Sequence, residues 1–220
     1  MAVLFSVCLI TSNFFVPRVW QLGNLPLQLS APVLLFPVTY VLNDCLTEVY
    51  GYRKSRLVIW IAFAMSAFVA LMSALACALP APLDEESKAV ADSFDSLFML
   101  VPRTTLASLL AFICGSTFNA FIMSRMKVLS SGKRFGLRAI VSSIGGEVLD
   151  SCVFFPIAYW GIMSPLSILS LGLMEVCVKV LFEVIVLPIT SRVVKVLKRR
   201  EGVDVYDIDI SYNPFKLSDI

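Results

Sequence analysis

The sequence contains no histidine and few charged residues. Asp, Glu, Lys and Arg together make up 15% of its 220 residues, against about a quarter in an average soluble domain. Histidine is a frequent zinc ligand and the usual group for proton exchange near neutral pH, so its absence leaves any proton chemistry to Asp, Glu, Lys, Tyr or Cys. The formal net charge of +2 gives no support for nucleic-acid binding.

Several motifs of metal sites and nucleotide hydrolysis are also missing. The six cysteines form no C-x-x-C pair, so they lack the spacing of a metal site or disulfide framework. We expect them to be small buried hydrophobic residues. No G-x-x-x-x-G-K-[ST] loop occurs, which argues against ATP hydrolysis by this chain. We therefore expect no cofactor and no bound metal.

Apolar residues are abundant instead. They make up 58% of the chain, and the mean hydropathy is +0.85, values typical of a protein embedded in a lipid bilayer. Six apolar stretches have about the length that crosses a bilayer: Ala2 to Val19, Leu29 to Tyr50, Leu57 to Leu79, Thr104 to Met126, Leu137 to Trp160 and Pro165 to Thr190. The sequence predicts an all-α integral membrane protein, with six transmembrane helices over residues 1–200 and a short cytoplasmic tail over 201–220.

The positions of Lys and Arg predict the orientation. Positive residues cluster after the second, fourth and sixth stretches, whereas the longest opposite loop, Pro80 to Pro102, is acidic. Cytoplasmic loops carry an excess of Lys and Arg, so both termini are expected in the cytoplasm. The first stretch lacks a basic segment before it and carries Asn13 in its middle, which favours a retained helix over a signal peptide.

Seven ionisable residues lie inside the apolar stretches. They form an acidic pair in the second stretch (Asp44, Glu48), a second pair in the fifth (Glu147, Asp150) and a triad in the sixth (Glu175, Lys179, Glu183). Residues three or four apart share one helix face. A charge at the centre of a membrane helix costs about 2.5 to 3.5 kcal/mol even on the most permissive scale, so these groups are expected to face the bundle interior.

Simpler roles stay open for some of these residues. Glu48 could pair with Arg53 and reach towards the lipid headgroups, and the two glutamates of the triad could be structural partners of its lysine. Asn13 and Asn119 could simply hydrogen-bond between helices. The deepest acids, Asp44 and the pair in the fifth stretch, favour a functional role.

The two acidic pairs also suggest an internal repeat. With three stretches in each half, the halves would have opposite orientations and the second and fifth stretches would be equivalent. Asn13 and Asn119 occupy the equivalent first and fourth stretches. A 3+3 inverted repeat is therefore a hypothesis, with helices expected to break near Pro37 and Gly145-Gly146 around a midplane site.

Several motifs resemble one known family. The most specific is Asp44-Cys45-Leu46-Thr47-Glu48-Val49-Tyr50-Gly51, preceded by Phe36-Pro37-Val38-Thr39. Further matches are Pro102-Arg103, Gly132-Lys133, Gly146-Glu147-Val148-Leu149-Asp150, Lys179 and Asn213-Pro214-Phe215. Together they resemble the queuosine precursor transporter family, also called the vitamin uptake transporter family. Two positions depart from its pattern: Asn119 replaces an acid, and Glu147 replaces a glutamine.

The resemblance implies a non-enzymatic transporter in the inner membrane of a bacterial cell. Its substrates would be small 7-deazaguanine compounds, such as 7-cyano-7-deazaguanine, 7-aminomethyl-7-deazaguanine or queuine, which are salvaged for tRNA modification. A carboxylate can accept both parallel donors of a guanine-like edge. The candidate substrate-binding residues are Asp150, Glu147, Asp44, Asn119, Asn13 and Lys179, and the candidate gating or ion-pair residues are Glu48, Arg103, Glu175 and Glu183.

Two functions other than transport by alternating access also fit this composition. A chain of this size could be the substrate-binding subunit of an ATP-driven vitamin importer. It could also be an intramembrane aspartyl protease using Asp44 and Asp150, although the G-x-G-D signature of such enzymes is missing. Proton coupling and a homodimeric assembly are left open, and so is the preferred precursor.

Overall fold

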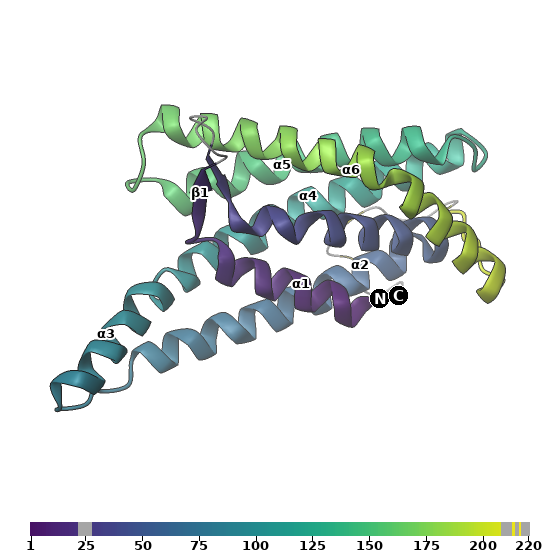
Figure 1. Cartoon of the computed structure of the whole chain (residues 1–220). Helices are drawn as coiled ribbons and strands as arrows, with labels where there is room; N and C mark the ends of the chain where they lie inside the picture. The colour runs from purple at the N-terminus through teal and green to yellow at the C-terminus, as the bar shows by residue number, and fades with distance from the viewer. Residues whose placement is uncertain (22–27, 208–212, 214–215, 217–220) are drawn as a thin grey trace.

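The chain folds into long helices joined by short connections (Figure 1). The computed structural model describes residues 1–21, 28–207, 213 and 216. The expected break at Gly23-Asn24-Leu25-Pro26, and Pro214-Phe215 of the tail, lie outside the described residues. In chain order the elements are α1 (Ala2–Phe15), β1 (Val19–Gln21), β2 (Gln28–Ser30), the 3-10 helix η1 (Ala31–Leu34), α2 (Phe36–Cys77), α3 (Glu85–Phe98), α4 (Val101–Leu129), α5 (Phe135–Tyr159) and α6 (Pro165–Glu201).

Helix α2 contains two of the expected apolar stretches. It is interrupted at Gly51, whose φ of 85° and ψ of 169° are not helical. A residue with a side chain adopts such a positive φ only with strain, whereas glycine does so freely. The single glycine therefore lets the chain reverse direction between two halves of α2 without a loop.

The helical segments run alternately in opposite directions along the bundle (Figure 1). The start of α1, the kink in α2, the α4–α5 connection and the end of α6 lie at one end, drawn on the right. The hairpin of β1 and β2, which pairs Val19 with Ser30, lies at the opposite end with the α5–α6 connection. The three basic clusters of the sequence consequently gather at the end where the chain begins; we call it the basic end.

Helices α4 and α5 approach each other closely at two glycines. A Cβ atom on Gly115 would lie 2.8 Å from the Cβ of Asp150, and a Cβ on Gly146 would lie 2.9 Å from the carbonyl oxygen of Gly115. The expectation that Gly145-Gly146 breaks its helix is wrong, because α5 is continuous from Phe135 to Tyr159. The absent side chains instead allow close helix packing, which brings the polar residues of α4 and α5 together.

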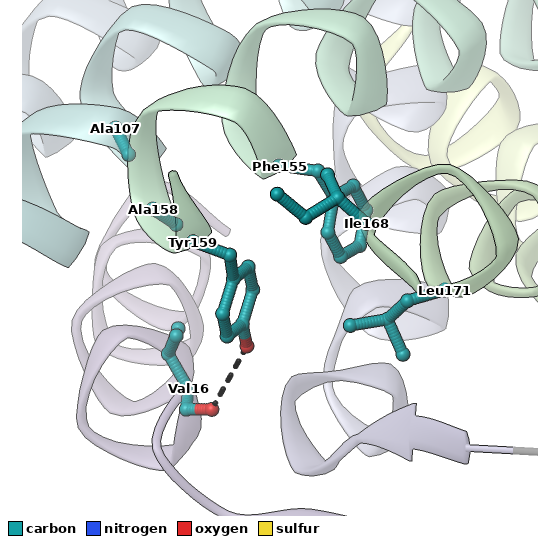
Figure 2. Close-up of a cluster of buried hydrophobic side chains, with 7 residues drawn as sticks. All are labelled: Val16, Ala107, Phe155, Ala158, Tyr159, Ile168 and Leu171. Atoms are coloured by element: carbon teal, nitrogen blue, oxygen red, sulfur yellow. Dashed lines mark hydrogen bonds between the residues drawn. The ribbon is translucent and has the colours of Figure 1, made fainter. Parts of the chain in front are cut away.

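An apolar cluster closes the bundle near the hairpin (Figure 2). Phe155 and Tyr159 of α5 stack with their ring centroids 5.9 Å apart, and Ile168 and Leu171 of α6 pack against them. The Tyr159 hydroxyl donates to the carbonyl oxygen of Val16 at 3.4 Å. This cluster fixes α5 and α6 to the end of α1.

The helix lengths support a membrane protein. By length and composition, three helical stretches of the described chain could cross a membrane: Phe36–Cys77, Glu85–Leu129 and Phe135–Tyr159. The expected six spans stay a prediction.

Two details differ from the sequence analysis. The loop Pro80 to Pro102 contains helix α3, whose start is capped by the Asp84 side chain accepting from the Ser87 N–H at 2.9 Å. Helix α6 continues beyond the expected stretch to Glu201.

The cysteines are less buried than expected. All six are free; Cys8 and Cys45 are buried, but Cys114, Cys152 and Cys177 are exposed. The expectation of uniform burial fails because much of the outer surface of the bundle is itself apolar, with exposed Leu, Ile, Val and Phe along most helices. A small apolar side chain is therefore as acceptable outside the bundle as inside it.

No group of residues suited to hold a metal ion occurs in the part of the chain that the structure describes.

Candidate functional site

Lys179 is the centre of a buried charged cluster halfway along α6. Its Nζ lies 3.2 Å from Glu147, 3.5 Å from Asp150 and 4.0 Å from Glu175. It also lies 3.9 Å from the ring centroid of Phe36, a cation–π contact. One ammonium group thus faces three carboxylates from two helices, and the acids outnumber their counter-charge as the sequence predicts.

A narrow polar cavity adjoins this cluster. Asp150, Glu175, Lys179 and Asn13 contribute to its wall, together with five aromatic side chains: Phe5, Phe36, Tyr40, Phe112 and Phe154. The space open to the centres of water molecules is about 20 Å³, little more than one water molecule requires. The site is therefore closed around a space too small for a bicyclic base.

A second polar contact lies between α2 and α4. The Nδ2 of Asn119 is 3.5 Å from Oδ1 of Asp44, at the long limit of a hydrogen bond. Glu183 is buried and close enough to Asp44 for their charges to interact. The triad suggests Lys179 as the partner of Glu183, but the structure places Glu183 near Asp44. Among the described residues Glu183 forms no ion pair with Lys179.

Glu48 belongs to a separate network at the basic end. Its carboxylate accepts two hydrogen bonds from Arg138, at 2.6 and 3.0 Å, and one from Lys198 at 2.7 Å. The alternative pairing with Arg53 is wrong. The kink at Gly51 starts the second half of α2 in a new direction, so Arg53 is exposed while Glu48 is buried.

Two candidate gating residues lie towards the hairpin end. The Ser30 hydroxyl donates to the Glu175 carboxylate, whose two oxygens are 2.8 and 3.0 Å away, and so joins α6 to β2. Arg103 donates to the carbonyl oxygens of Ile157 and Trp160 at 2.9 and 2.5 Å. It therefore caps the C-terminal end of α5, a structural role, since a helix end leaves such carbonyls without partners.

Sequence reasoning missed the partners of Glu48. Arg138 and Lys127 look like positive residues of a cytoplasmic loop, but both are buried. Lys127 donates to the carbonyl oxygen of Glu48 at 2.7 Å. The signal that could have found them is charge balance: a buried carboxylate needs a cation, and α5 carries Arg138 one turn from its start.

Unpaired acceptor atoms lie around the cavity beside Lys179 and around the Asp44–Asn119 contact. Oδ1 of Asn13, Oδ1 of Asn119 and Oε1 of Glu183 are buried and have no hydrogen-bond partner among the described residues. Leaving such an atom unsatisfied is costly. A ligand rich in N–H donors, with a flat face for the aromatic rings, would match this arrangement.

Comparisons with known proteins agree with these features. Residues 30–193 match the family described as "Putative vitamin uptake transporter". A protein of Bacillus subtilis (strain 168) named "Probable queuosine precursor transporter" is 26% identical over 131 residues. The match covers 59% of this chain and 56% of that protein, so the chain spans about half the length of the curated relative. No solved structure matches the chain.

The family match covers about three quarters of the chain and includes the acidic pairs of α2 and α5 as well as Lys179. It confirms the resemblance seen in the motifs around Asp44 and Asp150. This chain belongs to the vitamin uptake transporter family.

Proposed function

We propose that this protein imports a queuosine precursor, a 7-deazaguanine base or its nucleoside, for the modification of tRNA. The observation that carries the proposal is the buried cluster of Glu147, Asp150 and Glu175 around Lys179, placed beside a cavity lined by aromatic rings. Family membership and the name of the Bacillus subtilis relative support it. A transporter of this family needs no catalytic group.

Asp150 is the proposed partner of the guanine-like edge. Its carboxylate is part of the cavity wall and can accept the N1–H and the 2-amino group together. Glu147 does not line the cavity but pairs with Lys179, which does, at 3.2 Å. Asn13 would read a ring nitrogen or carbonyl group from the opposite wall, and Phe36 or Phe154 would stack on the base. Asp44 and Asn119 would meet the substrate on its way towards the basic end.

The excess of carboxylates suits an amine-bearing substrate. Three acids face Lys179 alone, so the ammonium group of 7-aminomethyl-7-deazaguanine could share them. Uncharged 7-cyano-7-deazaguanine could not make this interaction. Competition between the two compounds for uptake would test the preference.

We also propose that the chain crosses a bacterial inner membrane six times, with both termini in the cytoplasm. The alternating direction of the helical segments and the gathering of positive residues at the basic end support this orientation. The first half of α2, which carries Asp44 and Glu48, runs opposite to α5, as an inverted repeat requires. A reporter fused after Ile220 should report a cytoplasmic location, and a periplasmic signal would reverse the assignment.

Transport would proceed by alternating access. The proposed closures are the Ser30–Glu175 contact in the cavity wall on the hairpin side and the Glu48 network at the basic end. One closure would have to open at a time to admit or release a base. If buried acids also carry protons, uptake should collapse when an uncoupler dissipates the pH gradient; uptake that is indifferent to it would exclude the coupling.

The deciding experiment uses a bacterial cell that cannot make the precursor. Expression of this chain with added precursor should restore queuosine in the cell's tRNA, measured by mass spectrometry of nucleosides. Asp150→Asn, produced at an equal level, is the matched negative control. No queuosine with any of the three precursors would refute the proposed function.

A further inference from the structure

The segment Val203–Asp207, which follows α6, folds back over the kink in α2. Its backbone N–H at Val205 donates to the carbonyl oxygen of Val49 at 3.2 Å. The Asp207 carboxylate accepts from the backbone N–H of Tyr52 at 2.9 and 3.1 Å. A break in a helix leaves backbone groups that must find partners elsewhere, and this segment supplies them.

Asp207 is well placed for this role. It is buried and lies at the start of the second half of α2, where a carboxylate accepts the free N–H groups of a helix and complements its dipole. The Ser124 hydroxyl of α4 donates to the same carboxylate at 2.5 Å. One side chain of the segment thus joins α2 and α4.

Asp204 is part of the charged network around Glu48. Lys127 lies 2.6 Å from Asp204 and donates to the carbonyl oxygen of Val205 at 2.6 Å. Lys198 lies 2.9 Å from Asp204 and 2.7 Å from Glu48. Partial burial acts to raise the pKa of Asp204, but the hydrogen bonds from the two lysines outweigh it and hold that pKa below its ordinary value.

Removal of the segment would leave an unbalanced cluster. Lys127, Arg138 and Lys198 would then share the single carboxylate of Glu48, with Lys127 almost fully buried. Cations without partners in a buried site are strongly unfavourable unless water enters. Docking of the segment therefore favours the close packing of the helices at the basic end. Release of the segment, in turn, favours their separation.

The segment also lies next to the candidate transport path. Glu48 is one helical turn, about 6 Å along the axis, from Asp44 towards the basic end. Cys45, which follows Asp44, belongs to a buried cluster with Val49 and Val194, and Val203 packs against this cluster. Cys45 is therefore a natural reporter of whether the segment is docked.

We propose that Val203–Asp207 is a movable seal, the tail seal, which closes the transport path at the basic end. Asp204 and Asp207 are the positioning residues that dock it, and it lifts in each transport cycle. The lifting rests on the proposed function; the docking rests only on the contacts given above.

The docking is tested in the full chain with Cys45 as its only cysteine, the other five being replaced by alanine. A bulky water-soluble maleimide should label Cys45 about tenfold faster in Asp204→Asn and in Asp207→Asn, since each loses a charge-assisted hydrogen bond. Asp92→Asn, which neutralises an exposed carboxylate on α3, should label at the original rate. Asp204 is partly exposed, so its variant should fold even where Asp207→Asn does not. An unchanged rate in monodisperse Asp204→Asn protein would overturn the seal.

The lifting is tested with Val205→Cys as the only cysteine, a position about a third exposed. Saturating 7-aminomethyl-7-deazaguanine should change its labelling rate several-fold. A rate that is unaffected in protein shown to transport this compound would mean a fixed cap and would overturn the lifting. If no precursor is taken up at all, the proposed function fails, while Cys45 still decides whether the segment seals the bundle.

Discussion

The guanidinium group of Arg138 holds the carboxylate of Glu48 through two hydrogen bonds, of 2.6 and 3.0 Å. Both side chains are buried, one on α5 and the other in the first half of α2. A two-pronged contact of this kind fixes geometry as well as charge. It therefore joins, at the basic end, the two helices that carry the acidic pairs.

Loss of Arg138 should destabilise the protein strongly. In Arg138→Leu the Glu48 carboxylate keeps Lys198 but loses its two-pronged partner inside the bundle, so we expect the free energy of unfolding to fall by about 3 kcal/mol. Denaturant unfolding of the detergent-solubilised protein, followed by circular dichroism, measures the change.

Two controls separate this pair from a general effect of lost charge. Arg53→Leu removes an exposed arginine and should change the free energy by no more than about 0.5 kcal/mol. The double variant Glu48→Leu with Arg138→Leu should recover part of the stability, because neither charge is then left alone. Equal losses in Arg53→Leu and Arg138→Leu would contradict this interpretation.

Much of the helical architecture could be predicted from hydropathy. Each of the six apolar stretches is largely helical, because long apolar runs satisfy their backbone groups within one helix. The joining of two of them in α2 could not be predicted, since it depends on the φ of Gly51 and on partners from the distant tail. α3 was missed because its apolar residues are diluted by acidic ones.

The candidate site was partly predictable for a similar reason. Charges inside apolar stretches point inward, and the structure does bring Lys179 to Glu147, Asp150 and Glu175. Which acids share a cation depends on how the helices are rotated and shifted relative to one another. The spacing of residues along one helix does not give this information. The sequence therefore suggests Arg53 as the partner of Glu48 where the structure has Arg138, a residue that looks like a surface charge but is buried.

Neutralising Asp150 should strongly reduce uptake, whereas neutralising Glu147 should not. Asp150→Asn loses the carboxylate in the cavity wall, and loss of its charged hydrogen bonds should reduce accumulation of labelled precursor about 10- to 100-fold. Glu147→Gln removes a carboxylate that does not line the cavity and should keep most of the uptake. Both proteins should stay folded, because Lys179 retains two carboxylates in each. Undiminished uptake by Asp150→Asn would remove it from the site.

The close approach of α4 and α5 makes a clear prediction for Gly146. In Gly146→Ala the new methyl group meets the carbonyl oxygen of Gly115 at 2.9 Å and the Cβ of Asn119 at 3.0 Å. Neither atom can move without shifting a helix, so the free energy of unfolding should fall by about 1 to 3 kcal/mol. Gly136→Ala is the control: its nearest contact is the flexible end of Leu187 at 3.2 Å, and a helical alanine should be neutral or slightly stabilising. A similar outcome for both would argue against tight packing at Gly146.

Gly51 and Gly161 form a matched pair that isolates the contact with the tail. Both have a positive φ, of 85° and 81°, so alanine at either position should cost about 1 to 3 kcal/mol of backbone strain. At Gly161 the methyl group meets nothing within 4 Å, whereas at Gly51 it lies 2.8 Å from Cγ1 of Val205 and 2.9 Å from Oδ1 of Asp207. Gly51→Ala should therefore lose more stability than Gly161→Ala and, unlike it, should speed the labelling of Cys45 in the single-cysteine protein. The same loss from both variants, with Cys45 equally protected, would mean that the tail does not rest on the kink.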